Sequence, residues 1–395
     1  MMRILGAIRQ SIAHGILGGM ELTTHDLYKG LVEKGCEVSV LTTQLKNSDE
    51  MTKTIDGVEY IFIAQAETGK YSNEYHFGVR DYFNLLIEQN NIPDIIHSAS
   101  GAAAILRQNT QKVPVIATWH GTRIEEELDK IANYVYVQGK RLLPKHFEGV
   151  YLGSIAPFVQ NGDFTKFDAH VAISPYMGKC IQSYGVSATQ VHIIRNALPD
   201  VFVQNRPKVH KIGKKITLGV VGRIVPMKGH LFFQEVMQHL DSEKYEILVV
   251  GAGESAEQYR QASSLHVEAI KVSREEMPTA YQQMDIFINP TFRSSGFDLT
   301  VQEALVSGVV TLISDLTPYA DYFNELKQKF AENSPLFMFN VGNIQSCLNA
   351  INRVAVNLQP MNDEVTAYFQ SEFQQERMID EYLSVFKQYA VKKEI

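Results

Sequence analysis

Cysteine is scarce in this chain, which has 3 cysteines among 395 residues. Cys36, Cys180 and Cys347 stand far apart and are odd in number. This pattern argues against a disulfide framework and against a cysteine-rich zinc site. We therefore expect the protein to work in the reducing cytoplasm.

An excess of positive charge and long apolar runs are also lacking. The 37 basic and 44 acidic side chains give a net charge of −7, so no general positive field exists to attract nucleic acid. No apolar run reaches the roughly 18 residues that cross a bilayer. Arg9, Gln10 and His14 interrupt the apolar N-terminal stretch, which argues against a secretory leader. We expect no nucleic-acid partner, and any contact with a membrane to be made from its surface.

The signatures of several common catalytic sites are missing. No two aspartates are separated by a single residue, so the Asp-x-Asp metal clamp of metal-dependent nucleotide-sugar enzymes is absent. G-x-x-x-x-G-K-S/T, G-x-S-x-G and H-E-x-x-H are absent too, which argues against P-loop NTPases, serine hydrolases and zinc proteases. We expect no metal site.

Short apolar runs alternate instead with longer amphipathic segments such as Met20–Lys34 and Asp81–Gln89. The strands predicted in the first half are Ile4–Ile8, Glu37–Thr42, Val58–Ile63, Ile95–Ser98, Val115–Thr118, Ala169–Ile173 and Val191–Ile194. Those predicted in the second half are Ile216–Val221, Tyr245–Val250, Val267–Ile270, Ile286–Ile288, Val309–Ile313 and Leu336–Phe339. Strands separated by helices predict an α/β fold with parallel sheets that helices cover on both faces.

The alternation breaks at Asp200–Lys215, a polar and basic segment that contains Pro207 and Gly213. This segment predicts a linker between two α/β domains. From Asp363 onward the sequence predicts helix with no strand after it, so we expect this segment to pack across a domain boundary. Its apolar stripe consists of Phe369, Phe373, Met378, Tyr382, Leu383 and Phe386.

Ligands of open parallel sheets bind beyond the carboxyl ends of the strands, which makes the residues after each strand candidates for a site. Gly18 and Gly19 follow the first strand and precede a helix, where backbone N–H groups can approach an anion. Their spacing is not that of a dinucleotide fingerprint, and an ordinary flexible turn is the alternative. His120 follows the fifth strand in the segment TWHGT, although a lone histidine is often structural.

In the second half, Arg223 and Lys228 follow a strand and precede a helix. Two fixed cations there suit a diphosphate, and solvated surface charges are the alternative. Gly251 and Gly253 end the next strand and would admit a flat base or a ribose.

The segment NPTFRSSGFDLTVQEALVSGVV is the most informative one. Its small residues Ser295 and Gly296 would leave the N–H groups from Gly296 to Leu299 free for an anion or for sugar hydroxyls. Glu303, expected in the first turn of the next helix, suits a vicinal diol such as ribose. The alternative role for Glu303 is stabilisation of its own helix N-terminus.

Taken in order, these segments make the chain similar to a known family over nearly its whole length. The matching pieces are LGGMEL, TWHGT, DAHVAISPYMGKC, VHIIRNALPDVF, VGRIVPMKG and MDIFINPTFRSSGFDLTVQEALVSGVV. Together they resemble the retaining GT-B glycosyltransferases of the family 4 type, also called glycosyl transferases group 1.

The resemblance implies two Rossmann-like, doubly wound domains that face a central cleft. Residues 1–205 would bind the acceptor, and residues 206–374 would bind the nucleotide sugar. A terminal helix at about 375–395 would pack back on the first domain. The implied reaction moves a sugar from a donor such as a UDP- or GDP-sugar to a glycan, a lipid-linked saccharide or a small acceptor. It would proceed with retention and need neither metal nor cofactor, because the nucleotide sugar is a substrate.

The resemblance also implies roles for single residues. Arg223 and Lys228 match the pair that holds the donor diphosphate, and cations already in place would stabilise the charge that grows as the diphosphate leaves. Glu303 matches the second acidic residue of a Glu-x7-Glu motif that grips the ribose. The donor-contacting set is then Gly18, Gly19, Arg223, Lys228, Gly251, Gly253, Ser295, Gly296, Phe297, Asp298, Leu299 and Glu303. His120 matches a histidine near the transferred sugar, and with Arg223 and Lys228 it forms the expected catalytic set.

The chain departs from the family at three places. Ser295 stands where the first acidic residue of the motif is expected, and Asp298 replaces a usual glycine and offers a substitute carboxylate. Arg195 and Ala197 stand where Pro and Gly are usual. Two alternatives follow, namely a degenerate GT-B subunit that supports a partner glycosyltransferase and a nucleotide-sugar epimerase of the same architecture.

One further segment bears on location. Gln138–Phe147 mixes Lys140, Arg141 and Lys145 with apolar residues. It is either an ordinary exposed loop or a contact with anionic lipid at the inner face of the cell membrane.

Overall fold

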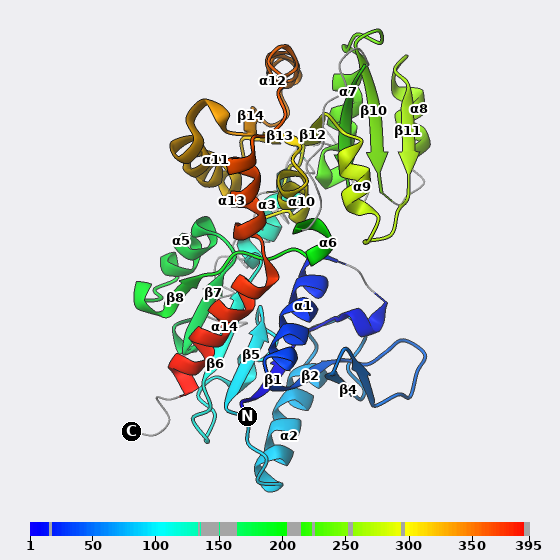
Figure 1. The fold of residues 1–395 in the computed structure, drawn as a ribbon. Helices are drawn as coiled ribbons and strands as arrows, with labels where there is room; N and C mark the ends of the chain where they lie inside the picture. The colour runs from blue at the N-terminus through cyan, green and yellow to red at the C-terminus, as the bar shows by residue number, and fades with distance from the viewer. Residues whose placement is uncertain are drawn as a thin grey trace. The chain divides into compact units, whose positions relative to one another are not determined.

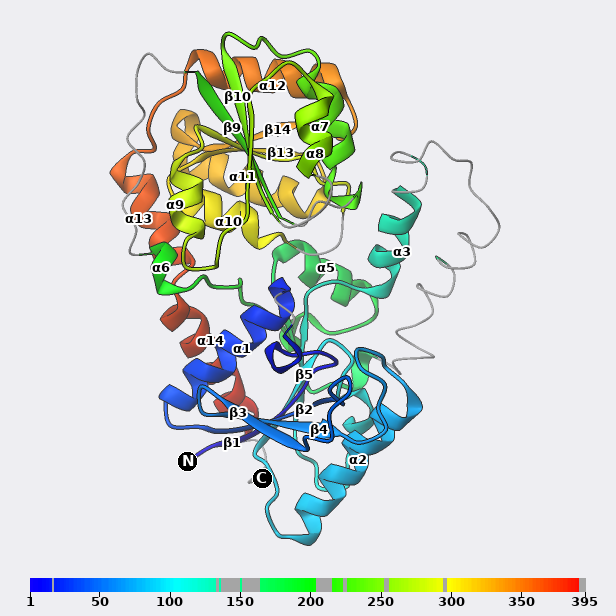
Figure 2. The same ribbon diagram turned by 90° about the vertical axis from the view of Figure 1, so that its right-hand side faces the viewer.

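The chain divides into two compact units in the computed structural model (Figures 1 and 2). The structure describes residues 1–15, 18–132, 164–203, 215–222, 226–251, 256–293 and 297–390, and the isolated positions 135 and 150. Unit 1 comprises Met1–Thr122, Leu152–Ala197 and Gln375–Ile395, and unit 2 comprises Arg123–Tyr151 and Leu198–Gln374. The basic segment Gln138–Phe147 and residues 204–214 of the predicted linker lie outside the described residues.

Unit 1 is built on one sheet whose described strands follow the order β3-β4-β2-β1-β5-β6-β7-β8. Its strands are β1 (Arg3–Ala7), β2 (Glu37–Thr43), β3 (Thr52–Ile55), β4 (Val58–Ile63), β5 (Ile95–Ala99), β6 (Val115–Trp119), β7 (Ala169–Ala172) and β8 (Val191–Ile193). Its α-helices are α1 (Gly19–Glu33), α2 (Asn73–Glu88), α5 (Pro175–Ser183) and α14 (Gln375–Ala390). Its short 3₁₀ turns are η1 (Ile12–His14), η2 (Ala104–Leu106), η4 (Phe164–Lys166) and η5 (Ala188–Gln190). The strands pair in parallel except β3, which runs antiparallel to β4.

Helices cover both faces of this sheet because successive strand residues point to opposite sides. Ile4 of β1 belongs to a core shared with Leu27 of α1 and Phe386 of α14. Its neighbour Leu5 belongs to a second core, shared with Val79 of α2 and other residues of α2 and α5. The predicted parallel sheet with helices on both faces is therefore confirmed for unit 1.

Helix α14 is fixed to the sheet by a buried polar chain as well as by apolar packing. The Tyr28 hydroxyl and His97 Nδ1 lie 2.8 Å apart, and His97 Nε2 lies 2.8 Å from Thr118 Oγ1. Thr118 Oγ1 in turn lies 3.0 Å from the Tyr382 hydroxyl of α14. Burial lowers the pKa of His97 to about 3, so its imidazole is neutral and serves as a donor and an acceptor within this chain.

The segment from Asp363, predicted to be helical, forms two helices. Helix α13 (Asp363–Glu372) ends before α14 begins at Gln375. Between them the carbonyl of Phe373 accepts a hydrogen bond from the Leu198 N–H at 2.9 Å, and Gln374 forms a β-bridge with Leu198. This pairing takes the Phe373 carbonyl out of the helical ladder and interrupts the helix.

Unit 2 contains a parallel sheet whose described strands follow the order β11-β10-β9-β12-β13-β14. Its strands are β9 (Ile216–Val221), β10 (Tyr245–Val250), β11 (Val267–Ile270), β12 (Ile286–Asn289), β13 (Val310–Ser314) and β14 (Leu336–Phe339). Its helices are α3 (Arg123–Ala132), α6 (Asp200–Val203), α7 (His230–Met237), α8 (Ala256–Ala262), α9 (Met277–Gln282), α10 (Leu299–Val306), α11 (Thr317–Phe330), α12 (Ile344–Val356) and α13, with 3₁₀ turns η6 (Pro226–Lys228) and η7 (Ala331–Asn333).

The faces of this second sheet are covered in the same way. Ile286 and Ile288 of β12 share a core with Phe233 of α7 and with residues of α8 and α12. Phe287 points to the other face, where its ring lies 5.8 Å from that of Tyr281 in α9. Helix α10 packs there against β12, β13, α9 and α13 (Figure 2).

The boundary between the units differs from the expected position at residues 205 and 206. Residues from Leu198 onward group with unit 2, because Phe202 of α6 is fully buried with its ring 6.4 Å from that of Tyr281. The segment that contains α3 also groups with unit 2, where Asp129 lies 3.7 Å from Arg293.

The predicted strands are confirmed, with ends shifted by no more than a residue. Strand β3 was not predicted, because its sequence TKTI is exposed along most of its length and shows no apolar face. Helix α2 begins at Asn73, well before the predicted Asp81, because the Ser72 side chain caps it by accepting a hydrogen bond from the Tyr75 N–H at 3.3 Å. None of the described helices has both the length and the apolar character needed to span a bilayer.

We predict that Phe386→Ala lowers the free energy of unfolding by about 3–5 kcal/mol, because a fully buried ring leaves a cavity between α14 and the sheet. Gln388→Ala, an exposed position of the same helix, should change it by less than about 0.5 kcal/mol. Urea unfolding followed by circular dichroism measures both values. Equal effects of the two changes would contradict the packing of α14 on unit 1.

Candidate functional site

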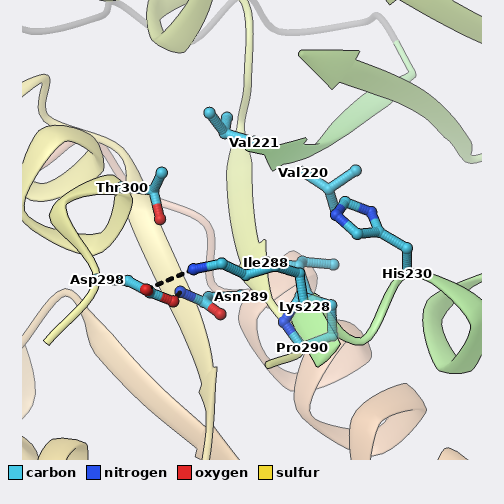
Figure 3. A pocket seen from close by; sticks show the side chains of 9 residues that line it. All are labelled: Val220, Val221, Lys228, His230, Ile288, Asn289, Pro290, Asp298 and Thr300. Atoms are coloured by element: carbon cyan, nitrogen blue, oxygen red, sulfur yellow. Dashed lines mark hydrogen bonds and ion pairs between the residues drawn. The ribbon is translucent and has the colours of Figure 1, made fainter. Parts of the chain in front are cut away.

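The strand order of unit 2 reverses between β9 and β12. The chain runs from β9 outward to β10 and β11, and then returns to β12 on the other side of β9. Such a reversal opens a crevice beyond the carboxyl ends of the two central strands. A small pocket lies at this position, lined by Val220, Val221, Lys228, His230, Ile288, Asn289, Pro290, Asp298 and Thr300 (Figure 3).

Lys228 enters this pocket because of the glycine that follows it. Gly229 is the residue before α7 and has φ +75°, a left-handed conformation that few other residues adopt. A Cβ atom at this position would overlap the carbonyl oxygen of Pro290, which follows β12. Only glycine therefore lets the turn after β9 lie directly against the end of β12, and this approach carries Lys228 into the pocket.

The ammonium group of Lys228 is paired with Asp298. Lys228 Nζ lies 2.5 Å from Asp298 Oδ1, and the Asn289 amide donates to Asp298 Oδ2 at 3.2 Å. Figure 3 shows the three side chains converging from η6, the end of β12 and the start of α10. The side chains of Lys228 and Asp298 are only 18% and 13% exposed, so water screens their attraction weakly.

The charge state of Asp298 follows from these neighbours. Burial alone would raise the pKa of its carboxyl group, but the positive charges of Lys228 and Arg293 and the hydrogen bonds from Lys228 and Asn289 outweigh burial and lower the pKa to about 2. Asp298 is therefore a permanent anion at neutral pH. The pair it forms with Lys228 leaves this part of the pocket close to neutral.

Glu303 lies on α10 but beyond its first turn, so the alternative role at its own helix N-terminus is wrong. Its Oε2 accepts a hydrogen bond from the Tyr281 hydroxyl of α9 at 2.8 Å. Burial raises the pKa of Glu303, and the hydrogen bond from Tyr281 acts in the opposite direction by favouring the carboxylate. The carboxylate is thus held in place by the Tyr281 hydroxyl of α9.

Two expectations about the turn before α10 need correction. The N–H of Asp298 is not free for an anion, since it donates to the Tyr319 hydroxyl of α11 at 3.1 Å. The Phe297 side chain packs away in the core, with its ring 5.0 Å from that of Tyr319 and 5.2 Å from that of Tyr322. Leu299 is the first residue of α10.

Gly251 directly follows β10, and a side chain there would overlap the carbonyl of Gly222, which directly follows β9. Its requirement for a small residue is therefore explained by strand packing. The other predicted donor residues of this unit, Arg223, Gly253, Ser295 and Gly296, lie outside the described residues.

Three polar residues of the pocket were not singled out as site candidates from the sequence, namely Asn289, His230 and Thr300. Asn289 is the last residue of β12, so its position at a strand end was the signal that could have identified it. His230 begins α7, and its Nδ1 contacts the hydroxyl of Tyr259 in α8. Nothing in the local sequence of His230 indicates that partner.

The predicted residues of unit 1 lie at the carboxyl ends of its own strands. Gly18 and Gly19 form the N-terminus of α1, and the Glu21 carboxylate folds back so closely that a Cβ on Gly18 would overlap it. His120 directly follows β6, and burial lowers its pKa to about 4. At neutral pH this imidazole is uncharged and can accept or donate a hydrogen bond.

Among the residues that the structure describes, no group of three or more His, Cys, Asp or Glu side chains is arranged to hold a metal ion. The charges available to a ligand in the described part of the unit 2 pocket are thus those of Lys228 and Asp298.

Known proteins resemble this chain in sequence and in fold. The O-antigen biosynthesis glycosyltransferase WclY of Escherichia coli is 24% identical over 157 residues, which make up 38% of this chain and 41% of WclY. The match thus spans less than half the length of that curated relative. Sucrose-phosphate synthase from Thermosynechococcus elongatus superposes with a TM-score of 0.72 at 14% identity, covering 98% of this chain and 99% of that one. HepE from Anabaena, solved with UDP and glucose, gives a TM-score of 0.66 at 13% identity, covering 98% and 100%. At these identities the two structures show a common fold.

Two family models match the chain in succession, "Glycosyltransferase Family 4" over residues 17–200 and "Glycosyl transferases group 1" over residues 215–357. Together they account for most of the sequence, in the order that the resemblance predicted. The protein therefore belongs to the GT-B glycosyltransferases of the family 4 type, with two Rossmann-like α/β domains.

Proposed function

We propose that this protein transfers a sugar from a nucleoside-diphosphate donor to a saccharide acceptor during the assembly of a cell-surface polysaccharide. The observation that carries the proposal is the fixed ammonium of Lys228 where the unit 2 sheet reverses direction. The name of WclY supports the place in polysaccharide assembly, and the UDP bound in HepE supports a uridine donor.

The chemistry of the donor explains why a cation is needed at this point. When the bond between sugar and diphosphate breaks, negative charge grows on the departing phosphate oxygen. An ammonium already in position stabilises that charge without reorganisation during the reaction. Lys228 supplies this charge in our proposal, so no metal is required.

The stereochemical outcome is proposed from the family resemblance. The acceptor would attack the face that the diphosphate leaves, and an oxygen of the leaving group would help to remove the acceptor proton. This arrangement retains the configuration of the sugar and needs no pair of carboxylates of the kind used by hydrolases. His120, uncharged at neutral pH, would offer the transferred sugar a hydrogen bond rather than a proton.

Asp298 would give the donor site two arrangements, one without donor and one with donor bound. Without donor, its carboxylate neutralises Lys228 at 2.5 Å. A donor diphosphate would compete for the same ammonium and displace Asp298, whose released carboxylate could then accept hydrogen bonds from sugar hydroxyls. A glycine, which the family usually has at this position, could neither neutralise Lys228 nor accept hydrogen bonds from the sugar.

The same ion pair favours a second candidate, the degenerate subunit that supports a partner glycosyltransferase. A lysine that is permanently neutralised by Asp298 would bind diphosphate poorly and leave the protein inactive alone. Transfer by the purified protein alone distinguishes the enzyme from the supporting subunit.

We predict that Lys228→Ala weakens UDP binding by roughly ten- to a hundredfold, because one charge-assisted hydrogen bond contributes about 1.5–3 kcal/mol. Lys327→Ala, an exposed cation on α11 of the same unit, is the matched control and should leave binding unchanged. Isothermal titration calorimetry measures both affinities. Equal affinity of the Lys228→Ala variant and the natural protein would refute the diphosphate assignment.

Asp298→Asn should strengthen the binding of UDP by about tenfold, because it removes the competing charge while keeping the size of the side chain. The same change should strengthen the binding of a UDP-sugar less, since the carboxylate that receives sugar hydroxyls is lost as well. Titrations with UDP and with UDP-glucose separate the two roles. If Asp298→Asn weakens UDP binding, Asp298 does not compete with the diphosphate.

Tyr281→Phe should move the loss of nucleotide binding in acid to higher pH. The Tyr281 hydroxyl favours the ionised form of Glu303, so its removal raises the pKa of Glu303, and protonation then abolishes the ribose contact at a higher pH. UDP affinity measured across a pH series gives the midpoint. Tyr259→Phe is the control, because it removes a hydroxyl that contacts His230 and not Glu303. It should leave the midpoint unchanged.

A further inference from the structure

Unit 1 has its own point of reversal, between β1 and β5. The chain runs from β1 outward to β2 and then to β4, and returns to β5 on the other side of β1. Arg9 follows β1, the segment after β4 leads into α2, and Arg107 follows η2 after β5. Ligand-binding residues of open parallel sheets gather at this kind of edge.

A close approach of two loops builds a cluster there. Gly69 has φ +75°, and its N–H donates to Thr43 Oγ1 at the end of β2 at 3.0 Å. A side chain at position 69 would collide with the Gln10 amide at 2.7 Å. The loop before α2 therefore lies against the segment after β1, and the Arg9 guanidinium lies 5.2 Å from the centre of the Tyr71 ring.

The Tyr71 ring is a partly exposed aromatic surface. It is 40% exposed, stacks on His76 with ring centres 5.8 Å apart and an interplanar angle of 17°, and lies 5.7 Å from the Tyr75 ring. An aromatic face held rigidly by its neighbours can pack against the C–H face of a sugar at little cost in conformational entropy.

Two polar atoms next to this ring have no hydrogen-bond partner among the described residues. They are Arg9 Nε and the hydroxyl oxygen of Tyr75, both buried, and the Tyr75 side chain is completely buried. An unsatisfied buried polar group costs about 1–3 kcal/mol, so two of them in one cluster point to a ligand that supplies the missing partners.

The charge of this cluster is positive. None of the described carboxylates pairs with Arg9, whose side chain is half-buried. The charge of Arg107 acts on His76, because it adds to the effect of burial in lowering the pKa of that imidazole. A half-buried guanidinium that no described carboxylate neutralises favours an anionic ligand.

We infer that Arg9, Tyr71, Tyr75 and His76 form a binding site for a sugar that carries an anionic substituent, a carboxylate or a phosphate. The sugar ring packs on Tyr71, and the anionic group accepts hydrogen bonds from Arg9. This inference rests on the proposed function in one respect, since it makes the anionic sugar part of the acceptor.

Three probes test the site on the full chain: methyl glucuronide, glucose 6-phosphate and the neutral methyl glucoside. Ligand-observed NMR titration should show both anionic sugars binding about tenfold more tightly than the neutral one, the effect of a single charge-assisted contact. Arg9→Gln should abolish this difference, and Tyr71→Ala should weaken all three. Arg80→Gln, an exposed arginine on α2, is the matched control and should change nothing.

Equal binding of charged and neutral sugars by the natural protein would overturn the inference, and so would an Arg9→Gln variant that keeps the difference. If inorganic phosphate binds as tightly as glucose 6-phosphate and its binding does not depend on Tyr71, the site recognises an anion and not a sugar. Competition by UDP would assign the cluster to the donor instead. UDP binding and its dependence on Lys228 are measured separately, so failure of the donor assignment leaves the result for Arg9 interpretable.

Discussion

An ammonium group held where a parallel sheet reverses direction is the constraint on which the pocket of unit 2 depends. The strand order puts β9 and β12 side by side, and Gly229 lets the turn after β9 touch the end of β12. Lys228 meets Asp298 there, the last residue before α10. The fold thus places a positive charge where the proposed function needs one for a departing diphosphate.

The partner of that ammonium is the carboxylate of Asp298. A glycine before α10 would leave the lysine open to solvent and phosphate, whereas Asp298 occupies it and is itself held by Asn289 and Tyr319. Asp298 is buried with its pKa lowered to about 2, so it stays charged under any ordinary condition. In the proposed function, a donor diphosphate would therefore replace one anion by another at Lys228, and its affinity would depend on the difference between two strong interactions.

The two units share one architectural feature, a reversal of strand order, but they place different cations beside it. Each has a sheet whose order reverses near its middle, and each gathers a cation beyond the carboxyl ends of its central strands. In unit 2 the cation is Lys228, paired with a carboxylate. In unit 1 it is Arg9, which lies over an aromatic ring and has no described carboxylate partner. A paired cation suits a ligand that brings more than one negative charge, and an unpaired one suits a single anionic group.

The sequence by itself determined the strands and the domain class, because alternating apolar runs depend only on local periodicity. It also placed Lys228, Asp298 and Glu303 near strand ends. It could not show that Lys228 meets Asp298, or that Tyr281 bonds Glu303, since these pairs are separated by 70 and 22 residues and meet only when neighbouring strands align. The broken terminal helix has the same origin, because its interruption at Phe373 comes from a hydrogen bond to distant Leu198. Local pattern fixed the elements, and tertiary packing decided which charges are paired and which are left for a ligand.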